Sequence, residues 1–383
     1  MRRPTLSSLF SACALLAAVN LPAAHGEISI GVIVSATGGA ASQGIPEKKL
    51  IEMLPPTVAG EPARYLILDD TTDPTMAARN ARKLVSEERV DVLIAASNTP
   101  SAVVIAGVAQ ESKTPHISMA PVVPTEAQFP WVFVVPQPTE LMLDAVLENM
   151  AKNGVKTVGY IGYSDSWGDL VHKHLNALAG EYGIKVLNNE RYARSDNSVT
   201  AQILKSMALK PDAMLVGATG TPATLPHLTL VNRGYTGKIY HTHGVVNNDF
   251  LRVGDKGVEG ALAPIGPVVV HNDLDDANPI KKVASDFVGQ YSQSYGGGPV
   301  NAFATWAYDA YLLLDKAAGA ALKTAKPGTE AFRVALRDAL EHDTAGLVGL
   351  NGIYNIGATN HNGLDKRARV MVEVKDTQWR LIK

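Results

Sequence analysis

Two segments of this chain, far apart in the sequence, share one pattern. Asp91–Pro100 reads DVLIAASNTP, and Asp212–Pro222 reads DAMLVGATGTP. Each begins as a buried apolar strand, continues as a loop of small residues, and ends in Thr-Pro, which favours the start of a helix. The free N–H groups of a helix start suit an anion such as a carboxylate. The repetition predicts two similar lobes that face one ligand across a cleft.

Apolar strands alternate with helical segments along most of the chain. This order is typical of parallel sheets covered by helices, so we expect an α/β fold of two doubly wound lobes, with the ligand beyond the carboxyl ends of the strands. The expected strands are Ile28–Val34, Tyr65–Leu68, Val92–Ala95, Thr157–Ile161, Ala213–Val216 and Lys238–His241. The expected helices include Pro74–Glu88, Ser101–Ser112, Leu141–Asn153, Asp169–Tyr182 and Val199–Leu209.

The length also favours two lobes, because 383 residues exceed what one core usually supports. Long helices are expected late in the chain, with a break at Gly296–Pro299, and Arg369–Lys375 and Gln378–Leu381 alternate like an antiparallel pair. We expect three crossings, near Val134–Pro138, Leu262–Gly266 and Asp343–Gly346, which would form a three-stranded hinge. The predicted first lobe is then 27–136 with 265–343, and the second is 137–264 with 344–383.

Residues 1–26 have the organisation of a cleaved signal peptide. Arg2 and Arg3 precede an apolar stretch, Leu9–Leu21, and Ala24–Gly26 supplies small residues before the cleavage point. The single cysteine, Cys13, lies inside this segment in a poor context for lipid attachment. An exported chain without cysteine in its mature part indicates a periplasmic location and no disulfide.

Composition and motifs exclude several function classes. The formal net charge of −2 argues against nucleic acid as a partner. Gly162–Gly168 does not match the serine elbow of hydrolases, and Gly217–Gly220 is too short for a phosphate-binding loop. His241 and His243 have the i, i+2 spacing of two metal ligands on one strand face, but two ligands do not make a site. We therefore expect no catalytic residue, no metal and no cofactor.

An ordered set of motifs resembles one family over nearly the whole of 27–383. The motifs are Ile30–Gly38 (IGVIVSATG), Leu68–Asp70 (LDD), Ala77–Leu84 (AARNARKL) and Gly168-Asp169. Together they resemble the type I periplasmic solute-binding proteins of ABC transporters, in the branched-chain amino acid group. Other motifs resemble a subgroup associated with aromatic acids such as hydroxycinnamates: Gly44–Lys49, Tyr240–Gly244, Phe250-Leu251 and His361–Arg369. The resemblance implies a monomer that delivers a small carboxylate to an inner-membrane ABC permease.

The same resemblance implies the ligand-binding residues. Small and hydroxyl residues after two strands of the first lobe hold the carboxylate in this family, and Ser97, Thr99 and Ala120 match them. Val122 falls where a threonine is usual, so one polar contact is missing. The other residues implied are Trp167 and Phe303 as aromatic covers, Gln43 in place of an aromatic residue, and His243 from the second lobe. The second Thr-Pro junction itself predicts Thr219 and Thr221 as further ligand contacts.

The main departure from the family lies at His243. Amino acid binders have an acid at this strand end to pair with the ammonium group of the ligand, and burying an ammonium without an anion is costly. We therefore expect a carboxylate without an α-amino group, with His243 at its carboxylate or at a para-hydroxyl group. Which of His241 and His243 faces the cleft is left open, and Arg191 and Arg194 are expected to be solvated.

Two alternatives stay open at this point. A branched-chain or other aliphatic amino acid would need an acid from elsewhere, such as Asp165 or Asp249. A sensory ligand-binding module or an exported hydrolase could use the same lobes, and the hydrolase would need a base beside a nucleophile.

Overall fold

Two parallel sheets form the framework of the protein. The computed structural model describes residues 26–294 and 300–382. The first sheet has the strand order β2-β3-β1-β4-β5-β6, in which only the β2–β3 pair is antiparallel. Its strands are β1 (Ile28–Val34), β2 (Thr57–Val58), β3 (Glu61–Asp69), β4 (Val92–Ala95), β5 (His116–Ser118) and β6 (Val132–Val134).

The second sheet has the order β16-β15-β12-β11-β10-β7-β8, and β9 also pairs with β7. Strands β7 to β12 pair in parallel, whereas β15 and β16 join the edge as an antiparallel pair. The strands are β7 (Thr157–Tyr163), β8 (Lys185–Val186), β9 (Glu190–Tyr192), β10 (Ala213–Gly217), β11 (Lys238–His241), β12 (Leu262–Ile265), β15 (Val370–Lys375) and β16 (Gln378–Leu381). The prediction of parallel sheets is confirmed, as is the antiparallel pair near the end of the chain.

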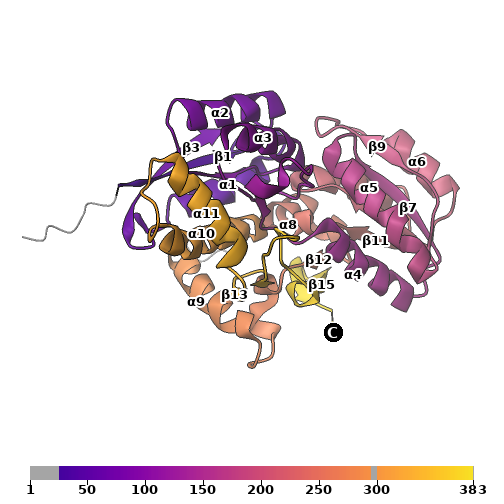
Figure 1. The fold of residues 1–383 in the computed structure, drawn as a ribbon. Coiled ribbons are helices and arrows are strands. Elements are labelled where there is room, and N and C mark those ends of the chain that lie inside the picture. Colours follow the sequence, from indigo (N-terminus) through magenta and orange to yellow (C-terminus); the bar gives the residue numbers. More distant parts are fainter. Residues whose placement is uncertain (1–25, 295–299, 383) are drawn as a thin grey trace, which may run out of the picture.

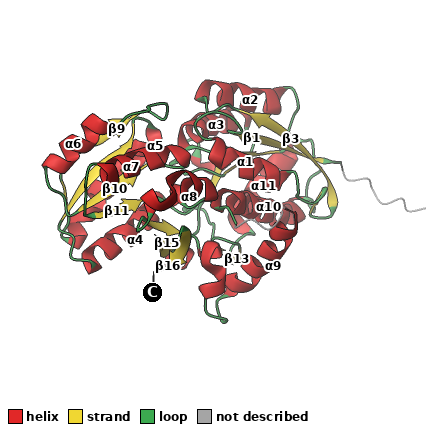
Figure 2. Ribbon diagram, turned by 180° about the vertical axis from the view of Figure 1, so that it is seen from behind, coloured by secondary structure: helices red, strands yellow, loops and turns green. Residues whose placement is uncertain are grey.

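Helices cover both sheets, and the late helices return to the first one (Figure 1). Figure 2 shows the same two groups of helices from behind. Beside the first sheet lie α1 (Ala41–Ile51), α2 (Pro74–Ser86), α3 (Thr99–Ser112), α9 (Pro279–Ser294), α10 (Ala302–Ala321) and α11 (Glu330–His342). Beside the second lie α4 (Thr139–Lys152), α5 (Ser166–Ala179), α6 (Thr200–Ala208), α7 (Thr224–Asn232) and α8 (Asn248–Gly254). No helix in the described ranges is both long and apolar enough to cross a membrane.

Local sequence explains why these elements begin where they do. All four residues of β4 are buried, as expected of a central strand with helices on both faces. Helix α2 begins at Pro74 after Asp73, whose side chain accepts a hydrogen bond from the backbone N–H of Thr75 at 2.7 Å. Its buried residues, Ala77, Ala81 and Leu84, are spaced by three or four positions, so one face of the helix packs on the sheet.

The chain crosses between the two sheets three times. Two crossings follow β6 and β12, close to the predicted positions. The third comes later than Asp343–Gly346, because the short pair β13 (Leu347–Val348) and β14 (Ile353–Tyr354) still packs on the first core. The chain joins the second sheet only at β15. The lobe boundaries stay a prediction. The packing of residues 344–368 on the first core favours their assignment to the first lobe. The predicted signal peptide, apart from Gly26, and most of the predicted break at 296–299 lie outside the described residues.

Candidate functional site

A cavity of about 20 Å³ lies between the two sheets, beyond the carboxyl ends of β4, β5, β10 and β11. Eight of the nine residues predicted to bind ligand line it: Gln43, Ser97, Thr99, Ala120, Trp167, Thr219, His243 and Phe303. Asn98, Met119, Pro121, Arg194, Gly244 and Trp306 complete the wall. The structure therefore brings together residues that span much of the chain, although their role in binding stays a prediction.

Thr221 is the predicted residue that does not line the cavity. Its backbone N–H donates to the hydroxyl of Ser42 in the first lobe at 3.1 Å, so this N–H is already engaged. Thr221 also begins a short 3₁₀ helix that precedes α7, so no α-helix starts there. The first junction differs too, because Asn98 rather than Thr99 caps α3 by accepting from the N–H of Ser101 at 3.1 Å. The two junctions are thus alike in sequence and different in hydrogen bonding.

An aromatic wall covers one side of the cavity. The His243 ring stands edge-on between the indole rings of Trp167 and Trp306, with centroid distances of 5.6 and 5.5 Å. Phe303 packs edge-on against Trp306 at 4.9 Å. These perpendicular contacts are favourable for aromatic rings and leave an apolar surface suited to a flat ligand.

The two neighbouring histidines have different surroundings. Strand β11 ends at His241, and His243 begins a short 3₁₀ helix, so the two do not share a strand face as the spacing suggested. His241 points into the core, where its Nε2 lies 2.8 Å from Nδ1 of His227. His243 lines the cavity, and burial lowers its pKa to about 4. A neutral ring at pH 7 offers one donor and one acceptor but no positive charge.

The positive charge in the cavity comes from Arg194, which was expected to be solvated. Its side chain is only 13% exposed, and its guanidinium lies 4.0 Å from the centroid of the Tyr163 ring. Nε donates to Asp165 at 2.7 Å, and Nη1 donates a long hydrogen bond to Oγ1 of Thr219 at 3.4 Å. A buried guanidinium, with its five N–H donors, is a strong binding group for a carboxylate.

Among the described residues, no aspartate or glutamate lines the cavity. Asp165 caps α5 through the N–H groups of Trp167 and Gly168 and also pairs with Arg194. Asp249, the other acid considered for an ammonium group, pairs with Arg252 on the surface of α8. The cavity therefore contains a cation and hydrogen-bond donors, and it lacks the anion that an amino acid ligand would need.

The two lobes touch directly around this cavity. Nε2 of Gln43 donates to Oγ1 of Thr219 at 2.9 Å, beside the contact between Ser42 and Thr221. Gly220 allows this approach, because it has a φ of +63° and a Cβ there would lie 2.6 Å from the Ser42 hydroxyl. A cavity that binds benzene measures about 150 Å³. A ring-sized ligand can therefore enter only when the lobes separate and these contacts break.

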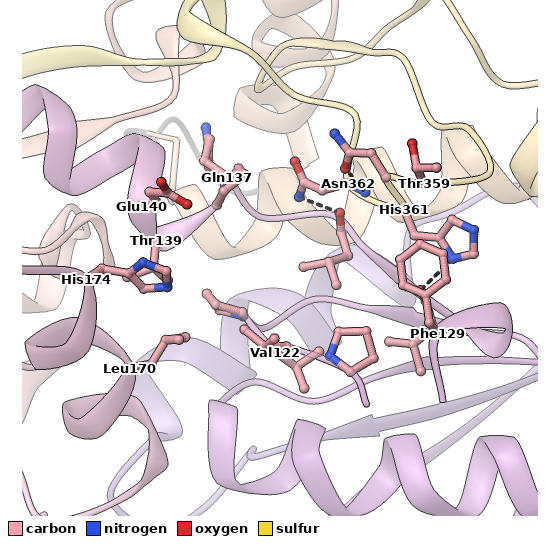
Figure 3. Close-up of a pocket in the computed structure, with 17 residues that line it drawn as sticks. Val122, Phe129, Gln137, Thr139, Glu140, Leu170, His174, Thr359, His361 and Asn362 are labelled. Atoms are coloured by element: carbon pink, nitrogen blue, oxygen red, sulfur yellow. Dashed lines mark hydrogen bonds between the residues drawn. The ribbon is translucent and has the colours of Figure 1, made fainter. Parts of the chain in front are cut away.

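A second pocket of about 320 Å³ lies beside the crossings between the lobes (Figure 3). Figure 3 shows Thr139, Leu170 and His174 on one side and Phe129 and His361 on the other. Val122 lines this pocket and not the central cavity. None of its lining residues is lysine or arginine, so it lacks a cationic partner for a carboxylate. In this respect it differs from the smaller cavity, which Arg194 lines.

One protein-family model matches almost the whole chain. The model described as periplasmic binding protein matches residues 27–378. The chain belongs to the periplasmic binding protein family. A search of the curated proteins finds no match.

Solved structures of other periplasmic binding proteins show the same fold. An extracellular ligand-binding receptor from Rhodopseudomonas palustris is 43% identical, with a TM-score of 0.91 over 93% of this chain and 99% of the other. A leucine-binding protein from Thermotoga maritima is 23% identical, with a TM-score of 0.78 over 93% and 98% of the two chains. An ABC transporter solute-binding protein from R. palustris in complex with benzoate is 19% identical, with a TM-score of 0.79 over 93% and 96%. The protein thus has the type I periplasmic binding fold.

Sequence reasoning missed two prominent residues of this periplasmic binding protein. Trp306 follows Phe303 by three positions on α10, so helical spacing could have placed both on one face. Arg194 follows β9 in a polar loop that carries no local signal of burial. Among the described residues there is no group of three or more histidine, cysteine, aspartate or glutamate side chains that could hold a metal ion.

Proposed function

We propose that this protein is the periplasmic receptor of an ABC importer and that it binds a small aromatic carboxylic acid between its lobes. The observation that carries the ligand class is the charge pattern of the cavity, where Arg194 is present and no acidic side chain of residues 26–294 or 300–382 lines the wall. The aromatic wall of Trp167, His243 and Trp306 suits a ring. Relatives of the same fold bind benzoate and leucine, and the charge pattern favours the first kind.

Hydrogen-bonding capacity supports the same ligand class. In the described part of the chain, neither Nε1 of Trp167 nor Nδ1 of His243 has a hydrogen-bond partner, although both atoms are buried. An unpaired buried polar atom costs about 1–3 kcal/mol. A carboxylate oxygen could accept from Trp167 and from His243, and a ring hydroxyl could also donate to His243. A ligand that binds the closed form more tightly than the open form shifts the protein towards the closed form. The closed form would then present the surface that the permease recognises.

Matched ligand pairs test the proposal most sharply. Phenylalanine and 3-phenylpropanoate differ only in the α-amino group, as do leucine and 4-methylpentanoate. We expect the acids without the amino group to raise the melting temperature of residues 27–383, with the aromatic acid giving the larger shift. At a hundredfold excess over its Kd, a ligand adds about 2.7 kcal/mol to the stability.

The neutral amide 3-phenylpropanamide is the control for the carboxylate and should give little shift. Stabilisation by leucine, with none by 4-methylpentanoate, would show that an acid does reach the ligand ammonium and would refute the proposed ligand class. Incubation with aryl esters at the same time would reveal any hydrolase activity, which we do not expect in this family of binding proteins.

A further inference from the structure

The hydroxyl of Ser97 lies between the cavity and a buried acid that the binding site does not otherwise use. Ser97 follows β4, lines the cavity and is 3% exposed. Behind it lies Glu47 of α1, which is 0% exposed and accepts a short hydrogen bond from the Ser97 hydroxyl. Gly44 allows α1 to come this close, because a Cβ there would lie 2.2 Å from the carbonyl oxygen of Ser35.

The hydrogen bonds of Ser97 depend on whether Glu47 carries a proton. A hydroxyl has one donor and two acceptor positions, and one acceptor position is taken by the N–H of Ser35 at 2.9 Å. When Glu47 is ionised, the proton of Ser97 is committed to it, so Ser97 offers only a lone pair to the cavity. When Glu47 is protonated on Oε2, it donates to Ser97. The Ser97 proton is then free to donate into the cavity.

The surroundings of Glu47 favour the protonated form. Burial raises the pKa of Glu47 well above its usual value, and the negative charge of Asp70 raises it further, whereas the hydrogen bond from Ser97 opposes this rise only in part. Its second oxygen, Oε1, is buried without a hydrogen-bond partner in the described part of the chain. Asp70 is itself held by the hydroxyls of Ser35 and Ser101 at 2.6 and 2.7 Å.

Other charged groups do not offset this environment. Lys48, the next residue on α1, pairs with Glu52 at the surface. Helix α10 contributes Phe303 and Trp306 to the cavity, and neither of them titrates. His243 and Arg194 belong to the opposite lobe, where Arg194 pairs with Asp165.

We propose that Glu47 is a positioning residue that holds a proton in the complex, so that Ser97 donates its hydroxyl to the ligand carboxylate. This inference rests on the proposed function. The step is balanced by one proton, which comes from the solvent whenever Glu47 is ionised in the free protein. Carboxylate affinity then falls as the pH rises through the titration of Glu47, up to tenfold per pH unit, and binding takes up as much as one proton.

Glu47→Gln is the decisive variant, because the amide keeps the shape and donates to Ser97 at every pH. Isothermal titration with 3-phenylpropanoate, in buffers of different ionisation enthalpy between pH 6 and pH 9, measures proton uptake directly. We expect uptake to increase with pH in the natural protein and to be absent in Glu47→Gln, which should bind at pH 6 within about threefold of the natural protein. Ser97→Ala should weaken binding of the carboxylate in both backgrounds. Equal proton uptake by the two proteins would overturn the proposal, as would loss of binding in a folded Glu47→Gln protein.

A measurement without ligand separates this inference from the proposed function. If the pKa of Glu47 is higher in the folded protein than in the unfolded chain, its proton stabilises the fold at low pH. This stabilisation is lost as the pH rises through the folded pKa. Urea unfolding should therefore show the natural protein losing stability relative to Glu47→Gln as the pH rises from 5 to 9. If no carboxylate binds but this trend is present, the proposed ligand is wrong and the proton on Glu47 stands. If carboxylates bind and the trend is absent, only the inference about Glu47 fails.

Discussion

Replacement of Arg194 by glutamine tests the charge argument for the ligand. Hydrogen bonds to charged groups contribute about 1.5–3 kcal/mol. Loss of one such interaction raises Kd by about 10- to 150-fold. Asp165 loses its ion pair in this variant, but it keeps the N–H groups of Trp167 and Gly168 and is 22% exposed. The cap of α5 should therefore survive, and the main effect should fall on the ligand.

Calorimetric titration with 3-phenylpropanoate measures the loss, and titration with its neutral amide should show a much smaller change. Arg194→Lys should give an intermediate affinity, because lysine keeps the charge but not the planar fork.

Arg191→Gln is the matched control for this prediction. Arg191 also lies over a tyrosine ring, that of Tyr160 at 5.5 Å, and it pairs with Asp169 at 3.2 Å. It does not line the cavity, so its removal should leave Kd within about threefold of the natural value, well under the loss from one charged hydrogen bond. An equal loss in both variants would show a general effect of charge. An unchanged Kd in Arg194→Gln would refute the reasoning.

Two further predictions concern closure and acid stability. Gln43→Ala removes the hydrogen bond to Thr219, worth about 0.5–1.5 kcal/mol, and should increase the radius of gyration of the ligand-free protein in small-angle scattering. Gln202→Ala, which removes a bond within the second lobe, should not increase this radius. Burial lowers the pKa of His116 to about 4, which is below its pKa in the unfolded chain. The neutral ring therefore stabilises the fold at pH values above the unfolded pKa, and this stabilisation is lost as the pH falls towards the folded pKa. From pH 7 to pH 5 the natural protein should lose about 2 kcal/mol more of unfolding free energy than His116→Gln in urea titrations; an equal loss would contradict the assignment.

The strands could be predicted because a parallel sheet buries whole strands. Val92–Ala95 and Lys238–His241 are read correctly from their apolar residues alone, and their bounds agree with the structure. Helix ends carry local punctuation as well, as Asp73 shows at the start of α2. The third crossing is harder to place from the sequence, because residues 344–368 have no periodic pattern to show which core they join. Their contacts with the first core are long-range.

The sequence alone determined the alternation of strands and helices, the two lobes and most of the cavity wall. The strands, helices and lobes follow from local burial patterns, and the cavity residues follow from the repeated Thr-Pro junction and from the family resemblance. Only the tertiary structure decided which side chains reach the cavity. His241 and His243 diverge because the chain turns after β11, Thr221 is engaged by Ser42 of the other lobe, and Arg194 is held in place by Asp165 and Tyr163. Each of these outcomes depends on a partner distant in the sequence or on a change of backbone direction, and neither leaves a periodic trace in the residues themselves.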